Sequence, residues 1–242
     1  MSKDLVPISA DALPALAPGL DVFKDIVQNS TFLQRVQLYT KGRYIDNGII
    51  TPGHYGVPVD EETIEDLGTE IDLIPLAWRP KAIDMSDRDT IIVNYDSNSE
   101  DYKRIRAAAD SESDSHCMYG PTFLVYERST SKFYELFFGN ASARRESSKL
   151  LGFCAISPQA AVDISKQTGK KVEARGPLPC TLKAKYITKG AYGWHVPSCH
   201  QCSTPFDNLP DIKVIVDEIT KFYALKTSEV EKVEEPVKKR AR

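Results

Sequence analysis

Two β-rich runs separated by three polar residues constrain the fold of this chain more than any other feature. Thr122–Arg128 and Lys132–Phe138 are rich in aromatic and β-branched residues, and Ser129-Thr130-Ser131 connects them. Runs of this composition joined by so short a polar link are typical of a β-hairpin. A second pair of runs, Leu182–Thr188 and Tyr192–Val196, surrounds a Lys-Gly-Ala turn and predicts another hairpin. The chain is therefore expected to contain an antiparallel sheet.

Helical and further extended segments flank these hairpins. Strands are predicted at Phe32–Thr40, Ile71–Trp78 (where Pro75 favours an edge position) and Thr90–Tyr95, and an extended segment at Gly48–Val59. Helices are predicted at Asp60–Leu67, at Ser142–Phe153 with Ser142 as its N-cap, at Pro158–Lys166 and at Asp211–Lys226. The segment Asp96–His116 is predicted to be an exposed excursion with one basic helical turn. This pattern indicates an α+β protein with an antiparallel barrel or curved sheet of about five or more strands.

The predicted domain organisation is an N-terminal arm at residues 1–29, one α+β domain at 30–226 and a charged tail at 227–242. Three prolines break the arm, and the tail lacks aromatic residues, so we expect the tail to be disordered. A division of the central region into two domains is possible but not required by its length. No apolar run approaches the ~20 residues that span a bilayer, and the first residues do not form a secretory signal. Five cysteines, an odd number, favour a reducing compartment, and we expect a cytoplasmic protein.

Signatures of catalysis are largely missing from the sequence. It contains no P-loop, no dinucleotide-binding glycine motif, no nucleophile elbow and no metalloprotease helix motif. The neighbours His116 and Cys117 are a poor nucleophile–base pair, because adjacent side chains rarely point at each other. The carboxylates of Asp60–Asp72 do not have the spacing of an EF-hand loop, and a solvated acidic surface explains them better. We therefore expect a protein that is not an enzyme and has no cofactor.

One segment has the spacing of a metal site. Cys199 and Cys202 are separated by two residues, which lets two thiolates face one tetrahedral ion, and His195 or His200 can add a third ligand. A structural zinc site needs a fourth ligand, for which Cys180 or Cys154 would have to approach in space. Plain reduced cysteines are the competing interpretation.

Aromatic and basic residues gather in and beside the two hairpins. The region 122–190 carries an excess of about seven positive charges, whereas 54–116 carries an excess of about ten negative charges. Rings that stack on bases and cations that follow phosphates are the combination that holds single-stranded nucleic acid. Because alternate residues of a strand share a face, about half of the rings must be structural. The predicted nucleic-acid-binding residues are Trp78, Arg79, Lys81, Tyr119, Tyr126, Arg128, Tyr134, Arg144, Arg145, Lys183, Lys185, Lys189, Tyr192 and Trp194.

Two of these groups have a more specific expectation. A turn after Trp78 is expected to lift Trp78, Arg79 and Lys81 toward solvent. Arg144 and Arg145 lie at the start of a predicted helix, where backbone N–H groups can receive a phosphate. Two solvated surfaces of opposite charge, with strand aromatics that only pack, are the competing interpretation.

Three stretches together resemble a known group of proteins. They run from Leu67-Gly68-Thr69-Glu70-Ile71-Asp72 to Trp78-Arg79-Pro80-Lys81-Ala82, from Cys117-Met118-Tyr119-Gly120-Pro121 to Phe123–Tyr126, and from Trp194 to Phe206. Their order is similar to that in uncharacterised proteins encoded by bacterial viruses, and the strand-rich layout resembles viral OB-fold single-stranded-DNA-binding proteins. The resemblance covers roughly residues 30–226 and implies an OB-like sheet and a role in phage DNA replication or recombination. This chain departs from those proteins in its C-terminal tail, which mixes acidic residues with a basic terminus.

The leading hypothesis is a non-enzymatic protein that binds single-stranded DNA with low sequence preference. Replication or recombination proteins that contact the tail, and a second copy of the chain, are its expected partners. The main alternative is a structural or assembly protein of a virus particle. A third hypothesis is a metal-dependent enzyme that uses Asp72, Asp84 or the segment from His195 to Cys202.

Overall fold

The computed structural model describes residues 33–60, 62–86, 90–111, 116–204, 206, 209–225 and 228–231. The predicted arm at residues 1–29 lies outside the described residues, as does the tail beyond residue 231. The chain divides into two compact units, each considered by itself. Unit 1 contains the described residues up to Arg79 and from Pro121 to Leu225, and unit 2 contains Pro80–Gly120 and the residues after Leu225.

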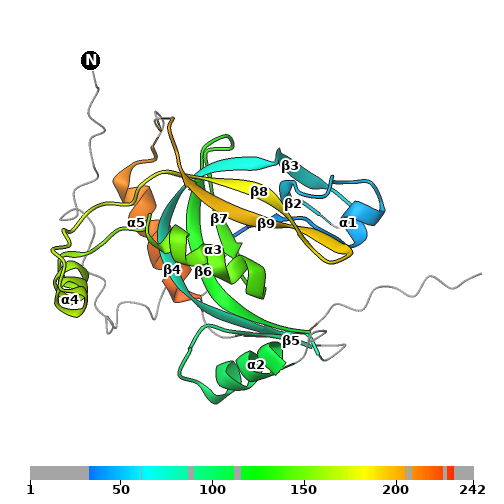
Figure 1. Cartoon of the computed structure of the whole chain (residues 1–242), viewed down its shortest axis with the longest axis horizontal. Coiled ribbons are helices and arrows are strands. Elements are labelled where there is room, and N and C mark those ends of the chain that lie inside the picture. The colour runs from blue at the N-terminus through cyan, green and yellow to red at the C-terminus, as the bar shows by residue number, and fades with distance from the viewer. Residues whose placement is uncertain are drawn as a thin grey trace, which may run out of the picture. The chain divides into compact units, whose positions relative to one another are not determined.

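Unit 1 is a sheet with helices on its faces (Figure 1). Its strands are β1 (Arg35–Leu38), β2 (Tyr55–Pro58), β3 (Ile64–Gly68), β4 (Glu70–Asp84, up to Arg79 in this unit), β6 (Cys117–Glu127, from Pro121), β7 (Lys132–Phe137), β8 (Cys180–Lys189) and β9 (Tyr192–Gln201). Its helices are α1 (Arg43–Asp46), α3 (Ala141–Leu151), α4 (Pro158–Thr168) and α5 (Ile212–Ala224). The strand order is β4-β6-β7-β1-β2-β3, and β8 pairs with β4 and with β9.

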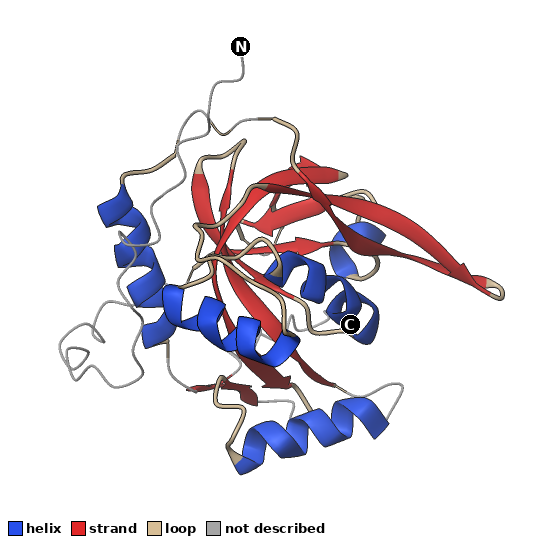
Figure 2. Ribbon diagram, turned by 60° about the vertical axis from the view of Figure 1, so that its left-hand side comes forward, coloured by secondary structure: helices blue, strands red, loops and turns tan. Residues whose placement is uncertain are grey.

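The central strands of unit 1 are buried on both faces. On one face Phe123 and Val125 pack in a core that includes Leu150 of α3. On the other face Leu124 and Tyr126 pack in a core that includes Phe222 of α5. The side chains of one strand alternate between these two cores, as the two-residue period of a strand requires. Figure 2 shows helices on the faces of these strands, and the distal part of the β8–β9 hairpin projecting from them.

Unit 2 contains the shorter sheet segment β10-β5-β4. Here β5 (Thr90–Asn94) pairs antiparallel with the last residues of β4 and with β10 (Ser228–Glu231). Helix α2 (Glu100–Ser111) buries Tyr102 and Ile105 against Ala82 and Cys117. The excursion predicted at Asp96–His116 therefore contains a twelve-residue helix, because its apolar residues lie on one face and have a core to cover.

The predicted hairpins are confirmed. β6 pairs with β7 from Thr122↔Phe137 to Glu127↔Lys132, and β8 pairs with β9 from Cys180↔Gln201 to Lys189↔Tyr192. The helices predicted near α3, α4 and α5 are also present. The N-cap of α3 is Asn140 rather than Ser142, because the Asn140 side chain accepts a hydrogen bond from the Ala143 N–H. β1, β2 and β5 fall within the segments predicted as extended.

Two local predictions are wrong. Asp60–Leu67 was expected to be a helix, but Ile64–Gly68 is β3, which pairs antiparallel with β2; pairing with a partner strand outweighs the local helical preference. The sequence also places Pro75 on an edge strand, whereas β4 has neighbours on both sides. Pro75 lies between the residues of β4 that pair with β8 (70–73) and those that pair with β5 (82–84), so its missing N–H costs no bond in either ladder.

The fold is α+β with a large, mostly antiparallel sheet; the β1–β7 pair is parallel. The sheet is open: among the described residues its strand order runs from β10 to β3, β8 and β9 branch from β4, and no pair joins these ends. The α+β class and an open, mostly antiparallel sheet with flanking helices agree with the prediction, and the described strands do not form a closed barrel. Among the described residues, no helix has both the length and the apolar character needed to cross a bilayer.

Candidate nucleic-acid interface

One face of the β8–β9 hairpin carries five of the predicted nucleic-acid-binding residues. The pairs Lys189↔Tyr192, Ile187↔Trp194, Lys185↔Val196 and Lys183↔Ser198 lie directly opposite each other in the register. Opposite residues of an antiparallel pair point to the same face, as do alternate residues of each strand. We call the set Lys183, Lys185, Lys189, Tyr192 and Trp194 the lysine–aromatic face.

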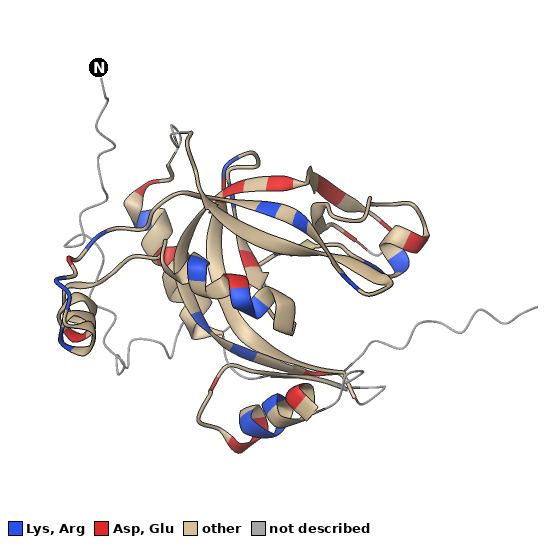
Figure 3. Ribbon diagram, viewed as in Figure 1, with Lys and Arg blue, Asp and Glu red and all other residues tan. Residues whose placement is uncertain are grey.

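The lysine–aromatic face is open to solvent toward the hairpin turn. Tyr192 is 79% exposed, the three lysines are exposed and Trp194 is half-buried. No carboxylate of the described residues lies within ion-pair distance of Lys185 or Lys189, whereas Lys183 pairs with Glu70 of β4 at 2.7 Å. Figure 3 shows the lysines along β8 and acidic residues on neighbouring strands. Two cations next to an exposed ring are thus available for an anionic ligand that can stack.

The opposite face of the same hairpin is partly occupied by packing. Tyr186 pairs with His195, and their ring centroids lie 5.0 Å apart. The Tyr186 ring lies over Gly193, where a Cβ would collide with its hydroxyl group. The His195 ring covers Gly53, where a Cβ would lie 2.7 Å from the ring. These contacts give the hairpin a fixed support behind the lysine–aromatic face.

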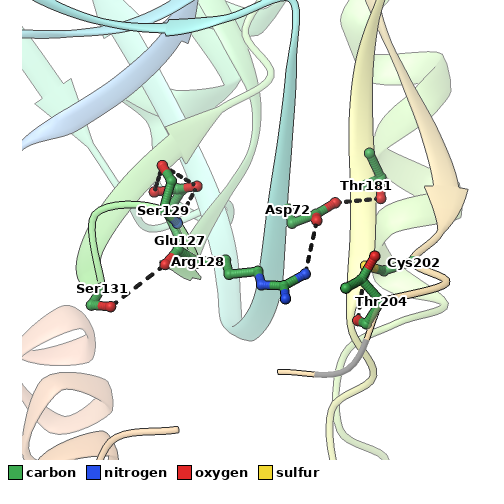
Figure 4. Close-up of polar contacts among 8 residues, drawn as sticks. All are labelled: Asp72, Glu127, Arg128, Ser129, Ser131, Thr181, Cys202 and Thr204. Atoms are coloured by element: carbon green, nitrogen blue, oxygen red, sulfur yellow. Dashed lines mark hydrogen bonds and ion pairs between the residues drawn. The ribbon is translucent and has the colours of Figure 1, made fainter. Parts of the chain in front are cut away.

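Polar residues continue this face of the sheet from β8 onto β4 and the end of β6 (Figure 4). Thr181 donates a hydrogen bond to Asp72 Oδ1 (2.5 Å), and Arg128 Nη1 lies 3.4 Å from Asp72 Oδ2. The Arg128 backbone N–H also donates to the Asp72 carbonyl oxygen (2.9 Å), and the Arg128 guanidinium lies over the Phe206 ring. Arg128 is therefore fixed on three sides and is a less available cation than Lys185 or Lys189.

Comparison with protein-family profiles, with curated proteins and with solved structures finds no match to this chain. Its function is therefore inferred from its own side chains. The remaining predicted site residues divide into those that packing removes from the surface and those that stay exposed elsewhere.

Tyr126 and Tyr134 are not available to a ligand. Tyr126 is buried in the core beside α5, and Tyr134 is fully buried in the core beside α3, with its hydroxyl donating to Thr130 Oγ1 at 3.0 Å. The prediction of a free aromatic face on the first hairpin assumed that one side of that hairpin was solvated. Helices cover both sides, so both sets of alternate rings are structural.

Arg79 is likewise buried, and it is part of the contact between β4 and the end of α5. Its Nη1 donates to the Leu225 carbonyl oxygen (2.7 Å), and its guanidinium lies 4.7 Å from the centre of the Phe222 ring. A cation that binds the last carbonyl group of a helix stabilises that terminus. The turn predicted after Trp78 does not form, since β4 continues to Asp84; Trp78 is nevertheless 44% exposed.

The two arginines of α3 have different surroundings. Arg144 is half-buried and donates from Nη1 to the Gly139 carbonyl oxygen (3.0 Å), whereas Arg145 is exposed. Helix α3 runs beside the outer edge of β9, where Glu146 accepts a hydrogen bond from the Cys199 backbone N–H at 3.4 Å. Of the pair, Arg145 alone presents its charge freely to solvent.

Lys81 and Tyr119 belong to unit 2. Lys81 is buried, with its Nζ over the Tyr95 ring, and Tyr119 donates a hydrogen bond to the Asp110 carboxylate at 2.8 Å. Both residues have internal partners within that unit. Neither adds to the lysine–aromatic face as unit 1 defines it.

The structure does not bring the predicted zinc ligands Cys199 and Cys202 together. Cys199 packs in the core beside α3, whereas Cys202 packs against the core beside α5 and its Sγ lies 3.3 Å from the Thr204 carbonyl oxygen. No three His, Cys, Asp or Glu side chains of the described residues are positioned to hold a metal ion. Two residues three apart point to opposite faces when the first lies in a strand, so the Cys-x-x-Cys spacing divides this pair.

The thiol partner of Cys199 is Cys180. Both lie on the inner face of the hairpin, where a hydrogen bond between the two thiols lowers the pKa of Cys199 and raises that of Cys180. Burial raises the pKa of the nearby Cys154 thiol to about 12. These cysteines thus behave mainly as core residues.

Sequence analysis missed three residues that shape the interface. Glu70 and Thr181 contact it only because of the β4–β8 register, which joins positions more than a hundred residues apart. Nothing local in the sequence indicates that register. Tyr186 does have a local signal, because it is an aromatic residue at an alternate position near a predicted turn.

Proposed function

We propose that the chain binds single-stranded DNA through the lysine–aromatic face of the β8–β9 hairpin. The observation that supports this is the register that aligns Tyr192 and Trp194 with Lys183, Lys185 and Lys189 on one exposed face. Each ring offers a stacking surface worth about 1–3 kcal/mol per base, and stacking depends little on sequence. The lysines supply the charge that follows the phosphates. Low sequence preference follows from this arrangement, since no base edge has to be recognised.

The two rings are two residues apart along β9, about 6.8 Å for a strand, so an extended chain can present successive bases to them. A duplex keeps its bases paired and stacked internally and offers no such surface. The proposal therefore favours single strands over duplexes. A role in phage DNA replication or recombination and an OB-like origin of the sheet, both implied by the sequence resemblance, are parts of the same proposal.

The test is a fluorescence titration with mixed-sequence oligonucleotides at low salt. Trp194 is the reporter, and Trp78→Phe removes the second tryptophan. We expect saturable quenching by single-stranded DNA and weaker quenching by the duplex. The logarithm of the association constant should fall by about 0.7 per phosphate contact for each tenfold increase in salt concentration. Titrations with RNA of the same sequence show whether the sugar is distinguished.

Tyr192→Ala is the decisive variant, because a side chain that is 79% exposed can be removed with little effect on folding. We expect it to weaken binding about 5- to 150-fold, which corresponds to one lost stacking contact. Tyr186→Ala is the comparison: it removes a tyrosine from the opposite face of the same hairpin, where the ring supports the lysine–aromatic face without contacting a ligand on it, and it should weaken binding less than Tyr192→Ala does. If both variants bind as the wild type does, or if the wild type binds no polynucleotide at low salt, the proposal fails.

The alternative of a structural or assembly protein also has an observation in its favour. Val162 and Ile164 of α4 and Leu178 after it are 47%, 37% and 43% exposed. Apolar side chains left at the surface of one segment are typical of a protein–protein contact. Light scattering over a concentration series tests it: a mass that grows with concentration and is reduced by Val162→Ser would favour assembly.

A further inference from the structure

The inner end of the lysine–aromatic face is bordered by two carboxylates of β4. The register places Glu70 directly opposite Lys183 and Asp72 directly opposite Thr181. Both carboxylates therefore share the face of the sheet on which a ligand would lie. Near the hairpin turn, Lys185 and Lys189 form no ion pair with the described residues. Nearer β4, Lys183 and Arg128 are each paired with a carboxylate.

The two carboxylate contacts differ in how easily they can be exchanged. Asp72 is part of the network with Thr181 and Arg128, in which backbone and side-chain bonds fix both partners. Among the described residues Glu70 forms its ion pair with Lys183, at 2.7 Å, and the two side chains are 57% and 50% exposed. The hydrogen bond that Lys183 donates to the Glu70 carboxylate raises the pKa of Lys183, so this lysine is fully charged at neutral pH.

An exposed ion pair of this kind contributes little to stability, because water and salt screen it. A phosphate oxygen offers Lys183 the same contact as a carboxylate oxygen does, a charged acceptor at hydrogen-bond distance. The remaining Glu70 charge would then stand beside the phosphate and repel it. Hence Lys183 adds less to the binding of an anionic ligand than Lys185 and Lys189, which have no carboxylate of the described residues to displace.

We propose that Glu70 competes with the ligand for Lys183 and thereby limits both the affinity and the length of the single strand bound along the lysine–aromatic face. The inference rests on the proposed function and adds a residue that sets its strength. In the wild type the strand is held by Lys185, Lys189 and the rings, and it ends before Lys183. Removal of the Glu70 charge extends the contact by one phosphate.

The experiment is a double-mutant cycle with Glu70→Gln and Lys183→Gln, read as oligonucleotide affinity and its salt dependence. We expect Glu70→Gln to tighten binding about 2- to 5-fold at low salt and to steepen the salt slope by about 0.7, as one added phosphate contact to a single strand requires. Lys183→Gln alone should change affinity by less than about 2-fold. In the Glu70→Gln background it should abolish the gain.

Glu65→Gln is the matched control. It removes the same charge from an exposed ion pair, Glu65–Lys132 at 3.5 Å, that is formed by β3 and β7 rather than by the hairpin. A gain of equal size in Glu65→Gln and Glu70→Gln would overturn the inference, because net charge alone would then explain it. So would a loss of affinity in Lys183→Gln as large as that in Lys185→Gln. A wild type that binds no polynucleotide refutes the proposed function itself, which separates the two failures.

Discussion

Glu127 at the end of β6 is a buried carboxylate whose removal should destabilise the first hairpin. The residue is 1% exposed, and its two oxygens accept hydrogen bonds from the backbone N–H groups of Ser129 (2.9 Å) and Thr130 (2.8 Å) and from both hydroxyl groups. All of these donors lie in the turn between β6 and β7. The carboxylate therefore satisfies in one place the polar groups that the turn leaves without ladder partners.

Glu127→Gln keeps the size of the side chain but replaces one acceptor oxygen with an NH₂ group. The hydroxyl groups can rotate to accept from it, whereas one of the two backbone N–H groups then faces another donor. A hydrogen bond to a charged group contributes about 1.5–3 kcal/mol, and a buried donor without a partner costs about 1–3 kcal/mol. We expect the free energy of unfolding of unit 1 to fall by about 2–4 kcal/mol, or the Tm by about 4–16 °C.

Urea unfolding followed by tryptophan fluorescence measures this loss, because Trp78 and Trp194 both belong to unit 1. The control is Glu173→Gln, which removes a carboxylate that is 76% exposed and paired with Lys171; it should change stability by less than about 0.5 kcal/mol. A free energy of unfolding of Glu127→Gln within about 0.5 kcal/mol of the wild-type value would refute the reasoning.

Two further predictions concern the support of the hairpin and unit 2. Gly53→Ala should destabilise the protein by clearly more than Gly48→Ala, since both glycines have positive φ (88° and 71°) but only at Gly53 would a Cβ collide with the His195 ring; thermal unfolding of the two variants decides it. Burial acts to raise the pKa of Asp84, but hydrogen bonds from Ser86 and from Arg104 outweigh it and hold the pKa well below its usual range. Its contribution to stability is therefore present above about pH 4 and lost as the pH falls below that value, so Asp84→Asn should lower the Tm by an amount that is larger at pH 7 than at pH 3.

The parts of the fold that sequence could predict are those set by local pattern. Both hairpins depend on short polar turns between β-rich runs, and helix α5 depends on apolar residues at helical spacing. Where the state of a segment depends on a distant partner, local pattern was insufficient. The acidic run before Gly68 looks helical by itself, but β2 is beside it and the segment becomes β3.

The candidate site was half predictable for the same reason. The two-residue period places the three lysines of β8 on one face, and the short turn sets the register that brings Tyr192 and Trp194 to that face. Burial of Tyr126 and Tyr134 follows from helices α3 and α5, whose packing no local pattern indicates. The predicted nucleic-acid-binding residues of the β8–β9 hairpin are therefore exposed or half-buried, whereas Tyr126 and Tyr134 of the β6–β7 hairpin are buried.

The position of β8 and β9 at one end of the sheet of unit 1 explains why part of their surface is exposed to solvent. A central strand such as β6 has helices over both faces, so every ring on it adds to one core or the other. The β8–β9 pair is covered on its inner face near β4, where Leu182 and Cys199 join the core, and becomes solvated toward the turn. On the lysine–aromatic face Lys185, Lys189 and Tyr192 are exposed and Trp194 is half-buried, while Tyr186 and His195 pack against each other on the opposite face. A rigid support behind an exposed ring lowers the entropy that binding must overcome, which is a physical reason for proposing the projecting hairpin as the ligand surface.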